Sequence, residues 1–198
     1  RDISLFGALP NCVILEPCNG AETKRALQWC VEEAEANCMM RLVISPSPRT
    51  ITLPEDYDFS FGKGTVLNEG RDAILFSYGP VMLHEALTAA EMLAEQNFSL
   101  KVVNVPWLNR IDDKWLVETI GDCQTIFSLD NHSEYGGLGD LLLNALMLSD
   151  NLHNKKLVKF AVEEHPACGT PPEALAYHRL DGKNLVTRVL KSKARSKV

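Results

Sequence analysis

The chain has 198 residues, of which 45% are hydrophobic and 23% are charged, and its formal net charge at pH 7 is −6. This balance is typical of a globular protein with one full-sized domain, or with one domain and part of another. The acidic net charge argues against a nucleic-acid partner. Only the segment 191–198 is strongly basic, and at a terminus we expect it to be a solvated tail.

No apolar segment approaches the roughly 20 residues needed to span a bilayer, and we recognise no signal peptide, so we expect no membrane association. The chain begins with Arg1 and not with Met, and we therefore expect a processed product or a piece of a longer polypeptide. Cysteines occur at positions 12, 18, 30, 38, 123 and 168, without a CxxC pair. We interpret them as small buried side chains in a reducing compartment, which predicts a cytoplasmic protein.

The first 54 residues predict a strand, a helix and a second strand. The apolar run 12–15 is the first strand, and the helix covers 19–37 with Asn19 as its N-cap. The second strand covers 40–45, and prolines in the following segment indicate a linker. The expected apolar face of the helix consists of Ala26, Leu27, Cys30, Val31 and Ala34.

From residue 62 onward, strands and helices alternate. Residues 64–79 predict two strands joined by a tight turn at 68–70, which is a β-hairpin. The later elements are expected at 80–97 (helix), 100–105 (strand), 112–122 (helix), 124–129 (strand), 138–150 (helix), 156–162 (strand), 171–178 (helix) and 181–193 (helix). This order predicts an α/β fold, with a mainly parallel sheet, helices on both faces and one antiparallel edge strand supplied by the hairpin.

The segment DNHSEYGGLGD (130–140) lies where a strand meets a helix, at the edge where parallel sheets gather functional groups. His132 stands beside Asp130 and Glu134, so it is either a polarised general base or a ring that bonds the turn or packs at a subunit contact. We favour the second interpretation, because no nucleophile or metal partner stands at a diagnostic spacing. No residue is predicted to be catalytic or to bind a metal.

The glycines of this segment, Gly136, Gly137 and Gly139, have two interpretations. Backbone N–H groups between a strand and a helix can bind a phosphate, but the spacing is not GxGxxG and the acidic flanks would repel an anion. We therefore predict that these glycines serve backbone geometry and close packing.

Arg41 stands inside the expected strand 40–45, where an arginine normally requires a partner. It could bind an anionic group of a substrate at the end of the strand. It could equally form a structural pair with a carboxylate such as Glu16. The residues alone leave both alternatives open.

Several segments occur in an order that resembles the C-terminal part of the transketolase-like thiamine diphosphate enzymes. They are 1–23, 40–45, 61–112, 130–142 (DNHSEYGGLGDLL) and 165–190. That family includes transketolases, 1-deoxyxylulose-5-phosphate synthases and the beta subunits of 2-oxo acid dehydrogenases. The resemblance implies that 1–54 is the end of a pyrimidine-binding domain, 55–70 a linker and hairpin entry, and 71–198 a transketolase C-terminal domain.

The resemblance also implies a function. The complete enzyme would transfer a two-carbon ketol unit with thiamine diphosphate and Mg²⁺, which other domains of the family hold. This chain would bind no cofactor alone, would require an N-terminal section or subunit, and would serve homodimerisation and the rim of the substrate channel, with His132 and the glycines at a structural loop or interface.

Arg41 is the one residue that the resemblance marks for substrate binding, as a contact to a phosphate or carboxylate. The deoxyxylulose synthases carry a second arginine where this chain has Ile44, which argues against that subfamily. Two other interpretations stay open: a non-catalytic α/β module for oligomerisation or regulation, and the C-terminal domain of a 2-oxo acid dehydrogenase beta subunit.

Overall fold

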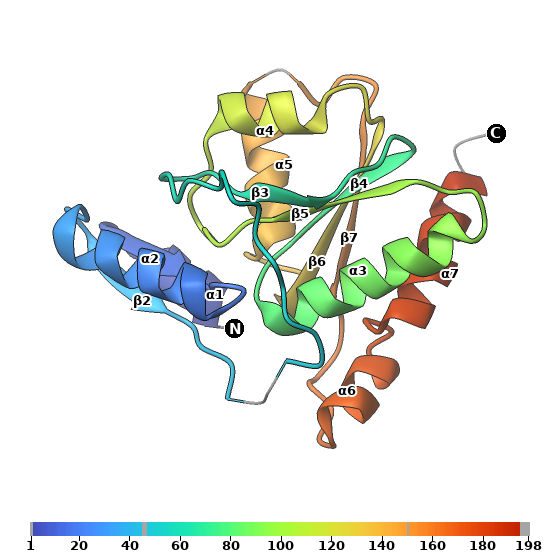
Figure 1. The fold of residues 1–198 in the computed structure, drawn as a ribbon, viewed down its shortest axis with the longest axis horizontal. Helices are drawn as coiled ribbons and strands as arrows, with labels where there is room; N and C mark the ends of the chain where they lie inside the picture. The colour runs from blue at the N-terminus through green and yellow to red at the C-terminus, as the bar shows by residue number, and fades with distance from the viewer. Residues whose placement is uncertain (1, 45–46, 150, 195–198) are drawn as a thin grey trace.

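The computed structural model describes residues 2–44, 47–149 and 151–194. Its larger sheet has five strands in the order β3-β5-β4-β6-β7 (Figure 1). The strands are β3 (Thr65–Asn68), β4 (Ala73–Ser77), β5 (Leu100–Asn104), β6 (Thr125–Ser133) and β7 (Lys156–Val162). Strands β4 to β7 are parallel, and β3 lies antiparallel to β5 at one edge. The predicted α/β class with a mainly parallel sheet is confirmed.

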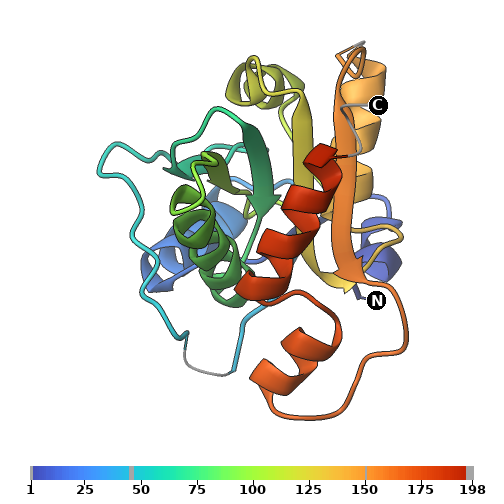
Figure 2. The same ribbon diagram turned by 90° about the vertical axis from the view of Figure 1, so that its right-hand side faces the viewer.

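Helices cover both faces of this sheet (Figures 1 and 2). On one face, α3 (Pro80–Ala94) and α7 (Gly182–Ala194) enclose an apolar core with the strands. On the other face, α4 (Asp113–Ile120) and α5 (Leu138–Leu148) enclose a second core. The short helix α6 (Pro171–Tyr177) lies beyond the end of β7. The sheet is therefore buried from both sides, as parallel sheets require.

The predicted hairpin is wrong. β3 does not pair with β4: it pairs with β5, and β4 lies on the other side of β5. The connection passes the start of β5 at Gly70, where a Cβ would lie 2.2 Å from the Lys101 nitrogen. The Asn68 side chain also donates to the Leu100 carbonyl at 2.8 Å. The Asn-Glu-Gly sequence therefore forms a crossover past a neighbouring strand.

A second sheet has two parallel strands, β1 (Cys12–Leu15) and β2 (Asn37–Met40). Together with α1 (Asp2–Gly7) and α2 (Gly20–Glu32), this sheet lies to one side of the large sheet (Figure 1). The segment after β5 joins the two parts, since the Leu108 nitrogen donates to the Ile14 carbonyl at 2.9 Å. The strand expected at 40–45 is misplaced, because β2 ends at Met40; residue 45 lies outside the described residues.

The ends and faces of α2 match the prediction only in part. Asn19 is the N-cap, because its side-chain oxygen accepts from the Glu22 nitrogen at 2.8 Å. The helix ends at Glu32, five residues before the predicted end at residue 37. Ala26 is buried, but Leu27 is 56% exposed and Val31 is 77% exposed. The expected apolar face is therefore only partly covered in this chain.

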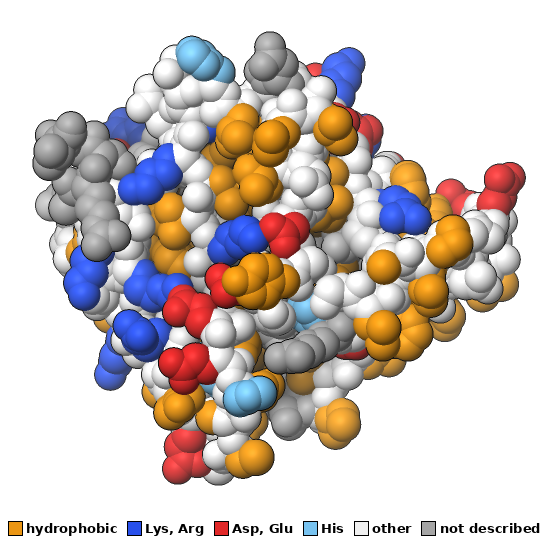
Figure 3. Space-filling model, turned by 180° about the vertical axis from the view of Figure 1, so that it is seen from behind, with side chains coloured by type: hydrophobic (Ala, Val, Ile, Leu, Met, Phe, Trp, Pro, Cys, Tyr) orange, Lys and Arg blue, Asp and Glu red, His pale blue; other side chains and the backbone are white. Residues whose placement is uncertain are grey.

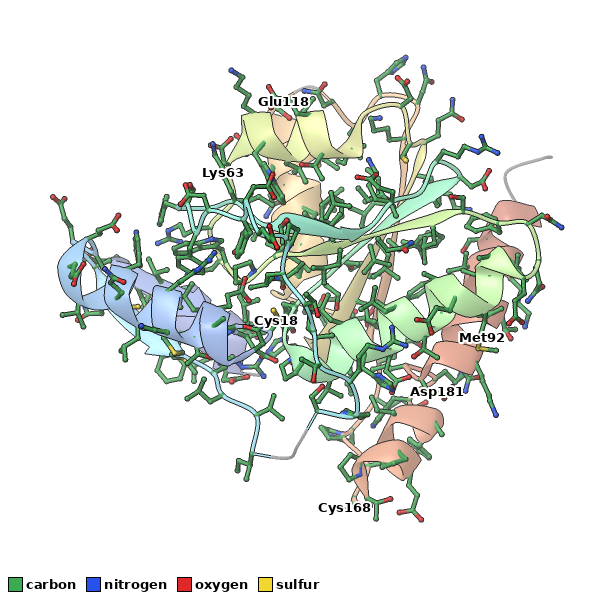
Figure 4. The ribbon with its side chains drawn as sticks, viewed as in Figure 1. Cys18, Lys63, Met92, Glu118, Cys168 and Asp181 are labelled. Atoms are coloured by element: carbon green, nitrogen blue, oxygen red, sulfur yellow. The ribbon has the colours of Figure 1, made fainter. Side chains whose placement is uncertain are left out.

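The six cysteines differ in their exposure, and Cys30 is half-buried. Cys12, Cys18 and Cys123 are buried, whereas Cys38 and Cys168 are exposed, so the interpretation of all six as buried is wrong for these two. Figure 4 shows Cys18 between the N-terminal elements and the large sheet, and Cys168 at the outer end of α6.

The described part of the chain holds no helix with both the length and the apolar character that crossing a membrane requires. The first residues of the basic segment 191–198 belong to α7, and residues 195–198 lie outside the described residues.

Candidate functional site

A polar network occupies the carboxyl ends of the parallel strands. Glu16 follows β1, Arg41 follows β2, Tyr78 follows β4, and Asp130 and Asn131 lie in the last part of β6. We call this group the carboxyl rim. Ligands of open α/β sheets bind at this edge, because the loops that leave parallel strands meet there.

Arg41 holds the carboxyl rim together. Its Nη1 donates to Glu16 Oε2 and, at 2.9 Å, to Asn131 Oδ1. Its Nε donates to Asp2 Oδ2 at 2.7 Å. The side chains of Arg41 and Glu16 are 17% and 3% exposed, respectively. The structural pair with Glu16, one of the two alternatives left open by the sequence, is therefore present, and the contact of Arg41 with a substrate stays a prediction.

Glu16 is buried among polar partners. Besides Arg41, its carboxylate accepts from Asn131 Nδ2 at 3.0 Å. Burial raises the pKa of Glu16 to about 7, although Arg41 and Asn131 act in the opposite direction. Gly79 has φ +65°, and a Cβ there would lie 2.0 Å from Glu16 Oε1. Only glycine therefore lets this carboxylate approach the start of α3 so closely.

Tyr78 and Asp130 form the buried floor of the carboxyl rim. The Tyr78 hydroxyl donates toward Asp130 Oδ1 at 3.0 Å and lies 3.1 Å from Asn131 Oδ1. Burial raises the pKa of Asp130 to about 6, against the stabilising hydrogen bonds from the Leu138 N–H and from Tyr78. Burial, with the neighbouring Asp130 carboxylate, raises the pKa of Tyr78 well above its ordinary value.

Asp130 also occupies the start of α5. Its Oδ1 accepts from the Leu138 nitrogen at 3.0 Å and its Oδ2 from the Gly139 nitrogen at 3.3 Å. The Gly136 nitrogen donates to Asp140 Oδ2 at 2.6 Å. The backbone donors that could hold a phosphate are therefore satisfied by carboxylates of the protein itself.

Each of the three glycines lies where a side chain would collide with a neighbour. Gly136 has φ +69°, and a Cβ there would lie 2.5 Å from Ser4 Cβ in α1. At Gly137 the nearest atom would be Asp130 Oδ1 at 2.9 Å, and at Gly139 it would be Ser128 Oγ at 2.6 Å. The loop thus brings α5 close to the sheet and to the N-terminal helix.

His132 connects the large sheet with the N-terminal elements. Its side chain is buried, with Nε2 at 3.3 Å from Ser4 Oγ and Nδ1 at 3.1 Å from the Ser133 carbonyl. Because Ser4 belongs to α1, the imidazole contacts the junction of the two parts of the molecule.

The sequence analysis did not single out Tyr78, Asn131 or Lys159. Lys159 Nζ lies 2.5 Å from Asp140 Oδ1 and 3.0 Å from the Glu134 carbonyl, so it fixes the glycine-rich loop. A signal existed for the first two, since each is a polar side chain that directly follows an apolar strand segment. Within residues 2–44, 47–149 and 151–194, no group of three or more His, Cys, Asp or Glu residues is arranged to hold a metal.

Comparison with known proteins decides the family. The sequence matches the family model "Transketolase, C-terminal domain" over residues 62–185. The chain belongs to the transketolase C-terminal domain family. Among relatives, it is 27% identical over 191 residues to a Methanocaldococcus jannaschii protein named as a transketolase C-terminal section, covering 96% of this chain and 58% of the relative. It is 33% identical over 151 residues to a transketolase family protein of Sinorhizobium fredii, covering 75% of this chain and 43% of the relative.

A solved structure supports the same assignment over nearly the whole chain. The protein described as "Split gene transketolase, inactive beta4 tetramer" superposes with a TM-score of 0.85 at 30% identity, covering 96% of this chain and 60% of that one. The chain therefore spans about half the length of the relatives it matches.

The transketolase family generally depends on thiamine diphosphate. The glycine-rich loop, which is the candidate phosphate site of the sequence analysis, does not fit the diphosphate of that cofactor. The amide donors at the glycine-rich loop are taken by Asp130, and its acidic neighbours would repel a diphosphate.

Proposed function

We propose that this chain is the C-terminal section of a transketolase-like enzyme that transfers a two-carbon ketol, or activated aldehyde, unit. The observation that carries the proposal is the superposition of 96% of the chain on a split gene transketolase at a TM-score of 0.85. Thiamine diphosphate and Mg²⁺ would supply the carbanion chemistry in the complete enzyme. We place the protein in the cytoplasm, and we assign it neither a nucleic-acid nor a membrane partner.

In this proposal, the two sections of the enzyme have different functions. An N-terminal section or subunit holds the cofactor, and this chain provides dimer contacts and the rim of the substrate channel. Residues 1–54 complete the pyrimidine-binding domain, 55–70 form the linker, and 71–198 form the C-terminal domain. The split gene transketolase is an inactive beta4 tetramer, which supports the expectation that such a section has no activity alone.

The exposed surface of the N-terminal elements supports the proposal that this chain binds another section or subunit. Large apolar side chains are exposed there, namely Leu5, Phe6, Leu9, Leu27, Val31, Leu42, Val43 and Ile44. Figure 3 shows apolar side chains gathered over this side of the molecule. Exposed apolar patches of this kind mark interaction surfaces. We propose that the N-terminal section, or its copy in a homodimer, covers them.

For Arg41 we propose a contact with a phosphate or carboxylate of the substrate at the carboxyl rim. Glu16 and Asp2 fix the guanidinium, and its 17% exposure leaves part of it accessible to an anion. Arg41→Lys in the complete enzyme should raise KM more than it lowers kcat, because lysine keeps the charge and loses the planar fork. An equal loss in kcat and kcat/KM would instead place Arg41 in the chemical step.

For His132 we propose a role in assembly. His132→Ala in the complete enzyme should weaken the complex or the affinity for substrate more than the chemical step, because the ring contacts α1 at the junction. Sedimentation of the complex and single-turnover kinetics separate the two effects. Lost turnover in an intact complex would make His132 catalytic.

The experiment that tests the function is reconstitution. The purified chain is mixed with an N-terminal section that carries the cofactor domains, and transfer from a ketose phosphate to an aldose phosphate is measured. We expect activity from the mixture and none from either section. Activity on 2-oxo acids alone would favour the dehydrogenase beta subunit, and a stable complex with no turnover on either substrate class would favour a non-catalytic module.

A further inference from the structure

A cavity of about 830 Å³ lies beside the carboxyl rim, between the ends of β6 and β7 and the helix α6. We call it the α6 cavity. Its volume falls within the range of natural small-molecule sites, and its place at the carboxyl ends of parallel strands is where open α/β sheets bind ligands. The other cavities described for this chain are smaller, the next being about 530 Å³.

Apolar side chains form most of the floor of the α6 cavity. Met82 and Leu180 are buried there beside the imidazole of His132, and Val162 and Leu175 add to the apolar lining. Tyr135 and Tyr177 also line the cavity and are 71% and 62% exposed, which places them at its mouth. This lining suits an apolar body, such as an aryl ring or a short alkyl chain, that enters past two aromatic rings.

The charged side chains that line the α6 cavity are both carboxylates, Glu163 and Glu164, and the described lining contains no lysine or arginine. Arg188 Nη2 donates to Glu163 Oε1 at 2.8 Å, which partly neutralises that residue. Within the described part of the chain, Glu164 makes no ion pair. Arg179 adjoins the same two carboxylates but lies outside the lining of this cavity. Within the cavity, the carboxylate of Glu164 is therefore the charge that a ligand meets, and it favours a cation over an anion.

One histidine of the lining is fixed by the backbone. The Ala167 nitrogen donates to His178 Nε2 at 3.0 Å, so this ring nitrogen acts as a hydrogen-bond acceptor.

We propose that the α6 cavity binds an organic cation, with an apolar body on the Met82–Leu180 floor and an ammonium group beside Glu164 and the mouth tyrosines. The ammonium group gains from the carboxylate and from the faces of the aromatic rings. Asn131 and His132 also line the α6 cavity, so it adjoins the carboxyl rim, but the binding of a cation there does not depend on the proposed ketol transfer.

A matched ligand series tests the proposal on the chain as it exists. Phenethylamine, phenethyl alcohol and phenylacetate share a ring and differ in charge, and their binding can be followed by two-dimensional NMR. We expect affinity to fall from the amine to the alcohol to the carboxylate, with shifts confined to the ends of β6 and β7 and to α6. Equal or stronger binding of phenylacetate, or no binding of the amine at millimolar concentration, would overturn the proposal.

Two variants with controls locate the site. Glu164→Lys should lower the affinity for phenethylamine by roughly 10-fold, because it replaces the attractive charge with a repulsive one. Glu95→Lys, outside the cavity, should leave this affinity unchanged. Ala174→Phe should block all three ligands by filling the cavity, while Ala176→Phe, on an exposed position of α6 outside the lining, should not. Circular dichroism checks that each variant folds. Amine binding that is unaffected by both Glu164→Lys and Ala174→Phe would contradict the assignment.

Discussion

The two parts of the molecule are stabilised in different ways. The five-stranded sheet is covered on both faces, and two large clusters of buried apolar side chains enclose it. The N-terminal elements have only a small cluster of their own, around Trp29 and Trp107. They attach to the large sheet through buried apolar residues such as Ile3 and Ile14, and through the carboxylate of Glu22, which accepts hydrogen bonds from Tyr57 and Asn104. Their outer surface is apolar and exposed. The difference supports the proposal that a complete C-terminal domain is joined to part of another domain.

The largest expected effect contrasts the two apolar environments. Phe76→Ala should lower the free energy of unfolding by about 3–5 kcal/mol, because Phe76 is fully buried in the large sheet. Ile44→Ala, at a fully exposed apolar residue, should change it by less than about 0.5 kcal/mol. Urea denaturation of both variants measures the contrast. A large loss for Ile44→Ala in the isolated chain would mean that the N-terminal surface is already covered there.

The second prediction contrasts two arginines. At a pH above the pKa of Glu16, Arg41→Ala should lower the free energy of unfolding by about 3 kcal/mol or more, because it leaves a buried carboxylate without its partner. Arg49→Ala, whose partner Glu91 is 61% exposed, should cost less than about 1 kcal/mol. Thermal denaturation gives both values. Equal costs would show that the carboxyl rim is open to solvent.

The third prediction concerns pH. Because burial raises the pKa of Glu16 from 4.5 to about 7, the folded state binds its proton more tightly than the unfolded state does. The stability from this group is fully present below pH 4.5 and is lost as pH rises through about 7, by at most about 1.4 kcal/mol per pH unit.

Glu16→Gln should remove this part of the pH dependence. Asp2 and Glu91, whose pKa values are lowered, act in the opposite sense at acidic pH, so the comparison is made as a difference between variant and parent. Glu118→Gln, at an exposed position on α4, is the matched control (Figure 4). A Glu16→Gln profile parallel to that of the parent would rule out a raised pKa.

The smallest expected effect tests the glycine-rich loop. Gly136→Ala should lower the free energy of unfolding, measured by urea denaturation, by about 1–2 kcal/mol, because Gly136 has a positive φ and lies close to Ser4. Gly20→Ala, where no atom lies within 4 Å of the added Cβ, should leave stability unchanged or raise it by up to about 1 kcal/mol. Equal results would show that the loop adapts without strain.

Strand and helix periodicity was enough to predict most of the large sheet. The helices after Gly79 and Asp112 begin where the sequence predicts, because proline at the first helical position and an aspartate N-cap are local signals. Pairing was not predictable in the same way. The Asn-Glu-Gly turn at 68–70 has the local chemistry of a hairpin, and only the close approach of Gly70 to Lys101 shows that β5 lies between the two strands.

The N-terminal part was harder to predict because its apolar pattern is shared between folding and assembly. Leu27 and Val31 continue the apolar periodicity of α2 but are exposed in this chain, and 42–44 extend the apolar run beyond the end of β2. The carboxyl rim was only half predictable. Arg41 is conspicuous in an apolar segment, but its contacts with Asp2 and Asn131 join residues that are distant in sequence.

We propose that this chain does not bind thiamine diphosphate by itself and that the cofactor binds only when an N-terminal section is present. Calorimetric titration of thiamine diphosphate with Mg²⁺ into the purified chain, alone and together with an N-terminal section, tests it most directly. We predict no binding to the chain alone and tight binding to the mixture. Tight binding to the chain alone would contradict the account.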